Sequence, residues 1–317
     1  MKMSNRIAWC LALTVAVPLC APAAAPPVKT QAPGYYRMML GDFEVTALLD
    51  GTMMLPAAKL LGNTTPAKVE ELLARSYLQD PVETSANAFL INTGSKLVLV
   101  DTGGGALLGP KMGGLLANLR AAGYQPEQVD EVYVTHMHAD HVGGLTAGDQ
   151  PAFPNAIVRA DQAEADFWLN QAHMQAAPEE AKASYEKAMA SLKPYVAAGR
   201  FKPFTGDAEL VPGIRALASH GHTAGHTTYV VESKGQRLAL WGDLMHVAAV
   251  QFADPSVVMN FDADTKAAAI ARQAAFADAA RQGYWVAAAH LPFPGIGHLR
   301  AGVTGYVWVP ANYSALR

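Results

Sequence analysis

Cysteine is almost absent from this sequence of 317 residues, and its two copies, Cys10 and Cys20, both lie near the N-terminus. The segment around them has basic residues, then an apolar run over 7–19 and a small-residue stretch over 21–25, which is typical of a secretory signal. We therefore interpret residues 1–23 as a signal peptide and expect export to the periplasm or the medium. A lipoprotein signal through Cys20 is the less favoured alternative.

The mature chain would then have no cysteine at all, although its compartment would permit disulfides. This absence excludes thiolate metal ligands and a cysteine nucleophile. A Gly-x-Ser-x-Gly segment, which would present a serine nucleophile, is missing too. Any hydrolytic chemistry must therefore depend on other groups.

An excess of positive charge is also lacking. Without the signal, 22 Lys and Arg residues stand against 27 Asp and Glu residues, a formal charge of −5. No basic stripe indicates a nucleic-acid partner. Beyond the signal, no apolar run reaches the roughly 20 residues that a membrane span requires. We expect no nucleic-acid partner and no membrane span.

The remaining sequence is 51% hydrophobic and alternates between strand and helix patterns, which predicts a layered α/β fold. Residues 24–34 are rich in alanine and proline and are interpreted as a flexible leader, and residues 35–317 as one domain. Strands are expected at 36–40, 43–49, 88–91, 97–100, 132–134, 156–159, 214–218, 228–231, 238–241 and 284–288. Helices are expected at 65–77, 112–122, 163–169, 179–198 and 267–281.

The run His136–His141, with the sequence His-Met-His-Ala-Asp-His, follows the expected strand 132–134 directly. It places three imidazoles and one carboxylate within six residues, and these are ligands that zinc prefers. Gly143 and Gly144 are expected to let the backbone turn tightly behind them. The run predicts a metal site, with zinc as the default and manganese, cobalt or iron as alternatives.

The motif His-x-His-x-Asp-His after a strand is the signature of the metallo-β-lactamase superfamily. This chain resembles that superfamily in four further elements: Asp101-Thr102-Gly103, the segment from Gly221 to His226, Gly242-Asp243, and His290. The resemblance covers about residues 35–300. It implies an αβ/βα sandwich of four layers, with two metal ions at one edge between the two sheets.

The resemblance also implies a role for each of these residues. One ion would take His136, His138 and His222, the other Asp140, His141 and His290, and Asp243 and a hydroxide would bridge the two. Asp140 and Asp243 would be the catalytic carboxylates. Asp101 and His226 would support the ligands from behind instead of binding metal. Two ions about 3.5–4 Å apart lower the pKa of a shared water to about 7.

A narrower resemblance links stretches 152–161, 165–169, 210–214, 247–252 and 287–298 to the methyl parathion hydrolase group of secreted hydrolases. It implies a binuclear hydrolase of organophosphate triesters, aryl esters or lactones, and a homodimer. These substrates are small and neutral, so they need an apolar pocket over the metals. The lack of cysteine excludes the cysteine-liganded β-lactamases, and the all-histidine β-lactamases lack the bridging aspartate that Asp243 would supply.

By this narrower resemblance, the candidate pocket residues are Trp168, Leu108, Tyr185 and His246. Leu108 stands where the group has an aromatic residue, and Tyr185 offers one aromatic where the group has two. Because each aromatic contact contributes about 0.5–1.5 kcal/mol, triester cleavage should be weakened. A lactonase or arylesterase with little phosphotriesterase activity is therefore the first alternative. A non-catalytic metal-binding protein and a mono-iron sulfur dioxygenase are alternatives of another class.

Overall fold

Six strands form the first sheet, in the spatial order β1, β2, β4, β5, β6 and β9. Neighbours from β1 to β5 are antiparallel, whereas β5–β6 and β6–β9 are parallel, so that β5, β6 and β9 end at the same edge. The bounds are β1 Tyr35–Leu40, β2 Phe43–Leu55, β4 Val82–Asn92, β5 Leu97–Val100, β6 Glu131–Tyr133 and β9 Ile157–Arg159.

Seven strands form the second sheet, in the order β10, β11, β12, β13, β15, β16 and β17. Its one parallel pair is β13–β15, and the crossover between these strands contains α9 (Thr265–Gln282), capped by Asp264 and ended by Gly283 at φ +69. The bounds are β10 Ala208–Val211, β11 Ile214–Ala218, β12 Thr227–Ser233, β13 Gln236–Leu240, β15 Trp285–Ala287, β16 Ile296–Ala301 and β17 Tyr306–Pro310.

The other elements are short apart from α2 and α7. The remaining α-helices are α1 Ala57–Leu60, α2 Pro66–Arg75, α3 Leu115–Ala121, α4 Ala139–Val142, α5 Gln162–Trp168, α6 Gln171–Ala176, α7 Glu179–Ala197 and α8 Ala248–Gln251. The 3₁₀ helices are η1 Gly105–Leu108, η2 Pro126–Gln128 and η3 Gly143–Leu145. Two small ribbons pair β3 Leu61–Gly62 with β14 Val258–Met259, and β7 Thr146–Ala147 with β8 Gln150–Pro151.

The computed structural model describes residues 25–316, so the predicted signal peptide lies outside the described residues. Residues 33–317 group as one unit, and residues 25–32, which lie before it, have no helix or strand and are exposed. No helix of the described part is long and apolar enough to cross a membrane.

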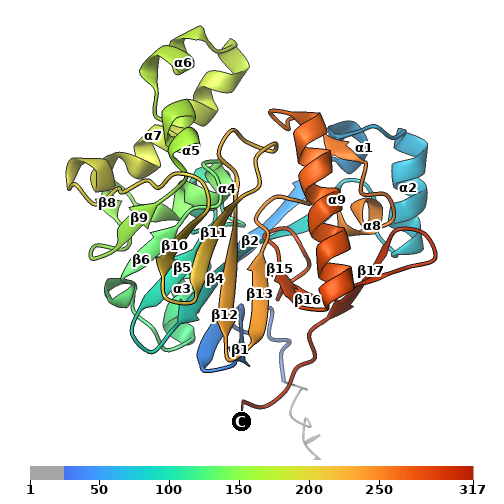
Figure 1. The fold of residues 1–317 in the computed structure, drawn as a ribbon, viewed down its shortest axis with the longest axis horizontal. Coiled ribbons are helices and arrows are strands. Elements are labelled where there is room, and N and C mark those ends of the chain that lie inside the picture. Colours follow the sequence, from blue (N-terminus) through green and yellow to red (C-terminus); the bar gives the residue numbers. More distant parts are fainter. Residues whose placement is uncertain (1–24, 317) are drawn as a thin grey trace, which may run out of the picture. The chain divides into compact units, whose positions relative to one another are not determined.

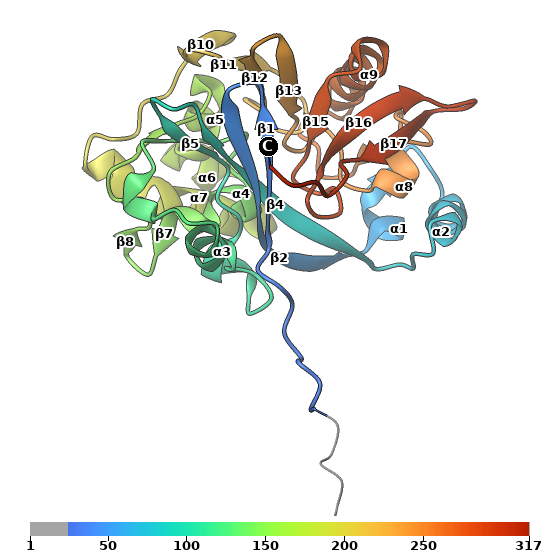
Figure 2. The ribbon, with the colours of Figure 1, turned by 90° about the horizontal axis from the view of Figure 1, so that it is seen from below.

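Three apolar cores lie between four layers, which confirms the expected α/β sandwich. The central core joins the facing sides of the two sheets, through residues such as Val45, Val98 and Tyr229. A second core packs the first sheet against α3, α4, α5 and α7, and a third packs the second sheet against α9. Figures 1 and 2 show these helix groups on opposite sides of the paired sheets.

Most expected elements are present, but several bounds differ. The helix predicted over 112–122 begins only at Leu115, because Gly113 has a left-handed φ of +88 just before it. Two strands are longer than predicted, since β2 runs on to Leu55 and β4 begins already at Val82. The strands β16 and β17 and the helix α6 were not predicted.

The tight turn predicted after the His136–His141 run is the 3₁₀ helix η3. Its glycines are not needed for a left-handed backbone, because Gly143 has an ordinary helical φ of −63. Instead, a Cβ on Gly143 would collide with the Gly104 carbonyl, and one on Gly144 with the Thr102 carbonyl. Glycine is required here because two backbone segments approach each other closely behind the site.

Candidate metal centre

All seven candidate ligands lie at one edge of the sandwich, where strands of both sheets end. This is the position at which open α/β sheets commonly bind ligands, outside the carboxyl ends of their strands. The residues are His136 and His138 after β6, Asp140 and His141 in α4, His222 after β11, Asp243 after β13, and His290 after β15.

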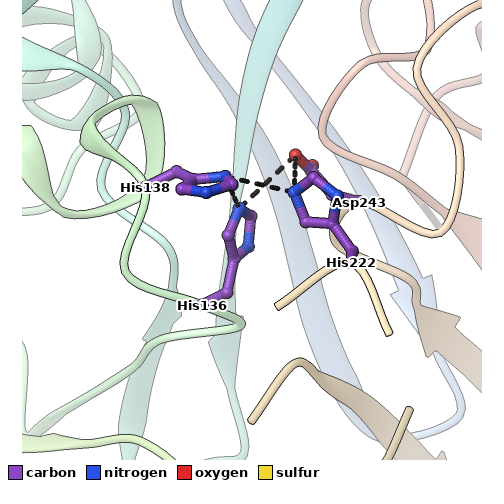
Figure 3. A group of neighbouring side chains, drawn as sticks. All are labelled: His136, His138, His222 and Asp243. Carbon is purple, nitrogen blue, oxygen red and sulfur yellow. Dashed lines mark hydrogen bonds and ion pairs between the residues drawn. The ribbon is translucent and has the colours of Figure 1, made fainter. Parts of the chain in front are cut away.

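The first group consists of His136, His138, His222 and Asp243 (Figure 3), which come from three separate loops and point toward one another. The Nδ1 atom of His138 lies 3.0 Å from His136 Nε2 and 3.1 Å from His222 Nε2. Asp243 Oδ2 lies 3.5 Å and 3.4 Å from the same two Nε2 atoms. The first group therefore presents four donor atoms around one point.

The second group consists of Asp140, His141, Asp243 and His290. Asp243 Oδ1 lies 3.2 Å from the Nε2 atoms of both His141 and His290. Asp140 Oδ2 lies 3.6 Å from His141 Nε2 and 3.4 Å from His290 Nε2. Asp243 thus gives one oxygen to each group and is the residue that they share.

The spacing of these atoms fits divalent cations. A tetrahedral zinc ion with bonds of about 2.0–2.1 Å needs ligand atoms about 3.3 Å apart. Two of the atoms are also orphaned, since His141 Nε2 and Asp243 Oδ1 are buried without a hydrogen-bond partner among the described residues. Buried polar atoms without partners are rare and call for an explanation such as an ion. Together, the two groups therefore have the donor set and geometry of one binuclear metal-binding site.

Several groups behind the ligands fix the direction of their rings. Asp101 Oδ2 lies 2.9 Å from His141 Nδ1, and Asp262 Oδ1 lies 2.7 Å from His222 Nδ1. The Ser85 carbonyl lies 2.9 Å from His290 Nδ1. In each case the bond leaves the Nε2 atom free to face the centre, as in metal-bound histidines generally.

His226 has a different supporting role. Its Nε2 atom accepts a 3.0 Å hydrogen bond from the Asp243 backbone N–H, and Ser219 Oγ lies 2.8 Å from its Nδ1. It therefore holds the main chain of the shared aspartate and does not face the centre as a ligand. Asp101 and His226 thus both lie behind candidate ligand residues.

The histidines of the centre differ in the direction of their pKa shifts, which are downward for two of them and upward for others. Burial lowers the pKa of His138 to about 3, and burial together with the charge of His141 holds the pKa of His136 well below its usual range. Burial alone would lower the pKa of His222, but hydrogen bonds to Asp243 and Asp262 raise it to about 9. Against the same effect of burial, Asp243 and Asp140 raise the pKa of His290 to about 10.

These shifts predict that zinc binding releases protons. In the metal-free protein His222 and His290 carry protons at neutral pH, and each must lose its proton to bind a cation. We expect release of about two or more protons per protein at pH 7, and an apparent affinity that rises with pH up to about 9–10. Titration with zinc in a weakly buffered indicator solution measures this count. Release of no proton would contradict it.

Three buried residues that the sequence analysis did not single out also support the centre: Glu164, Asp262 and Arg272. The Arg272 guanidinium donates from Nε to the Leu244 carbonyl, directly after Asp243, and its Nη2 lies 3.9 Å from Asp262 Oδ2. It thereby links α9 to the shared aspartate and to the partner of His222. Nothing in the local sequence marks these residues, because their contacts come only from the fold.

A large apolar cavity of about 450 Å³ opens beside the first group. Two of the candidate pocket residues, Trp168 and Tyr185, line it, and Phe167, which was not predicted, joins them. The rings of Trp168 and Tyr185 lie 4.8 Å apart, and that of Phe167 lies 5.1 Å from Trp168 and 5.4 Å from Tyr185. The helices α5 and α7 therefore provide an aromatic wall next to His138.

A smaller cavity of about 240 Å³ lies beside the second group. Leu108 and His246 line this cavity and not the large one, so the four predicted pocket residues belong to two different spaces. His246 Nε2 lies 3.1 Å from Asp243 Oδ2. Phe261 lines both cavities, and its ring lies 5.7 Å from that of His222 and 5.5 Å from that of His246. Phe261 thus stands between the two spaces, in front of the centre.

The profile of the Metallo-beta-lactamase superfamily matches residues 81–291 of this chain. An N-acyl homoserine lactonase of Bacillus sp is 28% identical over 195 residues, which cover 58% of this chain and 68% of that protein. A second, from Bacillus cereus, is 26% identical over 233 residues, which cover 70% of this chain and 83% of that protein.

Solved structures give the same result. The hydrolase AbOPH has a TM-score of 0.86 and 38% identity, covering 90% of this chain and 100% of that chain. AidC, a dizinc quorum-quenching lactonase in complex with an N-acyl homoserine product, has a TM-score of 0.82 and 25% identity. The match covers 89% of this chain and 99% of that chain. The profile match, the fold and the two His/Asp groups agree, and this chain belongs to the metallo-β-lactamase superfamily as one of its metal-dependent hydrolases.

Proposed function

We propose that this protein hydrolyses lactones that carry an apolar acyl chain, with N-acyl homoserine lactones as the substrate class. The observation that carries the proposal is the pairing of a binuclear centre with two unequal cavities. The larger is apolar and aromatic, and the smaller lies beside Asp140 and Asp243. The similarity to N-acyl homoserine lactonases supports the same substrate class.

Two divalent cations, which we propose to be zinc, would supply a nucleophile at neutral pH and polarise the lactone carbonyl. The chain itself positions the reacting groups. Asp243 belongs to both groups and fixes their separation. The Asp140 side chain is 18% exposed and lines the smaller cavity, so its carboxylate could accept the proton released by the attacking water and pass it to the alkoxide that leaves when the ring opens. The acyl chain would lie along Trp168.

The shape of the site favours a lactone over an organophosphate triester. An N-acyl homoserine lactone has its scissile ester bond inside a small ring and carries its acyl chain on that ring through an amide, which matches one small and one large cavity. A triester arranges three substituents around phosphorus, and Phe261 occupies part of the space in front of the centre. Leu108, in the smaller cavity, offers no aromatic face to an aryl leaving group.

Hydrolysis of aryl triesters is the second candidate function. The aromatic wall of Phe167, Trp168 and Tyr185 favours it, because a flat leaving group gains about 0.5–1.5 kcal/mol per aromatic contact. The wall serves an acyl chain equally well, so we propose that triester cleavage is the minor activity.

A substrate panel on one zinc-loaded sample tests the choice. We expect kcat/KM to be highest for N-hexanoyl and N-decanoyl homoserine lactone, lower for dihydrocoumarin and 2-naphthyl acetate, and lowest for methyl paraoxon. The chelator-treated protein is the control for metal dependence, and metal analysis distinguishes zinc from a single iron. Dominance of methyl paraoxon would reject the lactonase assignment in favour of the triesterase.

We further propose that the chain is exported, on the basis of the signal-like segment before residue 24. Expression in a bacterial host with two membranes should yield a protein in the periplasm that begins at Ala24. An uncleaved chain in the cytoplasm would contradict export. Light scattering on the same sample tests the homodimer.

A further inference from the structure

Glu164 is a fully buried carboxylate that belongs to neither metal group. It lies in the first turn of α5, whose N-terminus is capped by the Asp161 side chain through the Ala163 N–H. Its side chain is 0% exposed. A carboxylate buried this completely needs strong hydrogen-bond partners, and its partners show what it holds.

The two oxygens of Glu164 accept from two different loops. Oε1 accepts a 2.8 Å hydrogen bond from the Met137 N–H, and Oε2 accepts one of 2.8 Å from the Gly225 N–H. A Cβ on Gly225 would collide with the Glu164 backbone, so the second loop packs directly on α5. Both contacts are hydrogen bonds to a charged acceptor, which are the stronger kind.

The two donors stand next to the ligands of the first group. Met137 lies between His136 and His138 in the loop after β6, which belongs to the first sheet. Gly225 lies between His222 and His226 in the loop between β11 and β12, which belongs to the second sheet. One carboxylate therefore spans the two sheets at the point where their ligands meet.

The second group receives this support on one side only, because Met137 also precedes Asp140 and His141 in the chain. Among the described residues, its histidines are oriented by Asp101 and by the Ser85 carbonyl, and Glu164 makes no hydrogen bond to its loops outside Met137. The separation of imidazoles across the first group depends on how far apart the two sheets hold their loops. Glu164 fixes that distance directly.

We propose that Glu164 is a positioning residue that sets the metal affinity of the first group independently of the second. The proposal rests on the binding of two cations that the function above requires. Only a carboxylate serves both loops, because a glutamine would turn its NH₂ toward one of the two N–H donors. The residue also joins the centre to the large cavity, since Trp168 lies one turn further along α5.

The test is a stepwise zinc titration of metal-depleted protein against a chromophoric chelator. The wild type should bind two equivalents. Glu164→Gln should lower the affinity for one zinc ion by about 10- to 100-fold, which is the usual effect of losing a residue behind a metal ligand. The affinity for the other zinc ion should stay unchanged. Asp166→Asn is the matched control, because it makes the same carboxylate-to-amide change at an exposed position of the same helix.

A double-mutant cycle assigns the weakened site. Combined with His136→Ala, which disables the first group, Glu164→Gln should have no further effect on zinc affinity. Combined with His290→Ala, Glu164→Gln should lower the affinity for the one remaining cation by the same roughly 10- to 100-fold as in the single variant. Glu164→Asp, which keeps the charge but shortens the reach, should behave like Glu164→Gln and serves if the glutamine variant does not fold.

Two results would overturn the inference. Equal weakening of both cations, with a lower melting temperature of the metal-free protein, would make Glu164 a residue of general stability. Unchanged affinity at both sites would remove its role altogether. A wild type that binds fewer than two equivalents would instead overturn the proposed function, so the two failures can be told apart.

Discussion

Replacing Asp243 by alanine is expected to lower kcat/KM for lactones by about 1,000-fold or more, which corresponds to about 4 kcal/mol of lost transition-state stabilisation. Asp243 gives one carboxylate oxygen to each metal group and lies within 3.2–3.5 Å of four ligand nitrogens. Without it, each group keeps three of its four donors, and nothing holds the two at a fixed separation. Steady-state kinetics and metal analysis of the same sample measure the effect.

Asp140→Ala is the matched control for this prediction, because Asp140 belongs to the second group alone. Asp140→Ala should lower the affinity for one cation and leave the other bound, whereas Asp243→Ala should lower the affinity for both. The circular dichroism of the two variants should match that of the wild type. A fully loaded and active Asp243→Ala protein would show that the centre is not the one described.

Filling the large cavity should change which lactones are hydrolysed. Ala181 on α7 lines this cavity, and Ala181→Phe would place a ring in the space proposed for the acyl chain. About six methylene groups separate a decanoyl from a butanoyl chain, and their burial contributes up to about 5 kcal/mol. If half of this is realised, kcat/KM for the decanoyl lactone should fall about 70-fold, with the butanoyl lactone nearly unchanged.

Ala183→Phe controls for the added ring, since Ala183 lies on the same helix but is exposed and does not line the cavity. It should leave the ratio of the two lactones at its wild-type value. An equal loss of activity toward both chain lengths in Ala181→Phe would mean that the chain lies elsewhere. The smaller cavity beside Leu108 would then be the alternative position.

The metal ligands were predictable because four of them form one short motif and the other three lie in motifs that follow it in the order typical of the superfamily. The His136–His141 run places four of them within six residues, and the strand before it fixes their direction. His222, Asp243 and His290 are single residues in loops, and only the resemblance to the superfamily linked them to the run. The structure then brings all seven together at one edge.

The supporting residues could not be predicted, because their roles arise only when the two sheets meet. In the sequence, Glu164 looks like an ordinary acidic residue near the start of a helix, and its partners are 27 and 61 positions away. Phe261 lies in a loop without a motif, yet it faces both cavities. Leu108 was a candidate pocket residue, but only the fold shows that the centre has two separate cavities and that Leu108 lines the smaller one.

The residues that form the two metal groups also indicate at which stage of folding the cations can bind. Each group takes two donors from the first half of the chain and two from the second, on opposite sheets. Neither half can therefore assemble a complete site alone, and loading has to follow the docking of the halves. We therefore expect the metal content to depend on which suitable cations are present where the two halves dock.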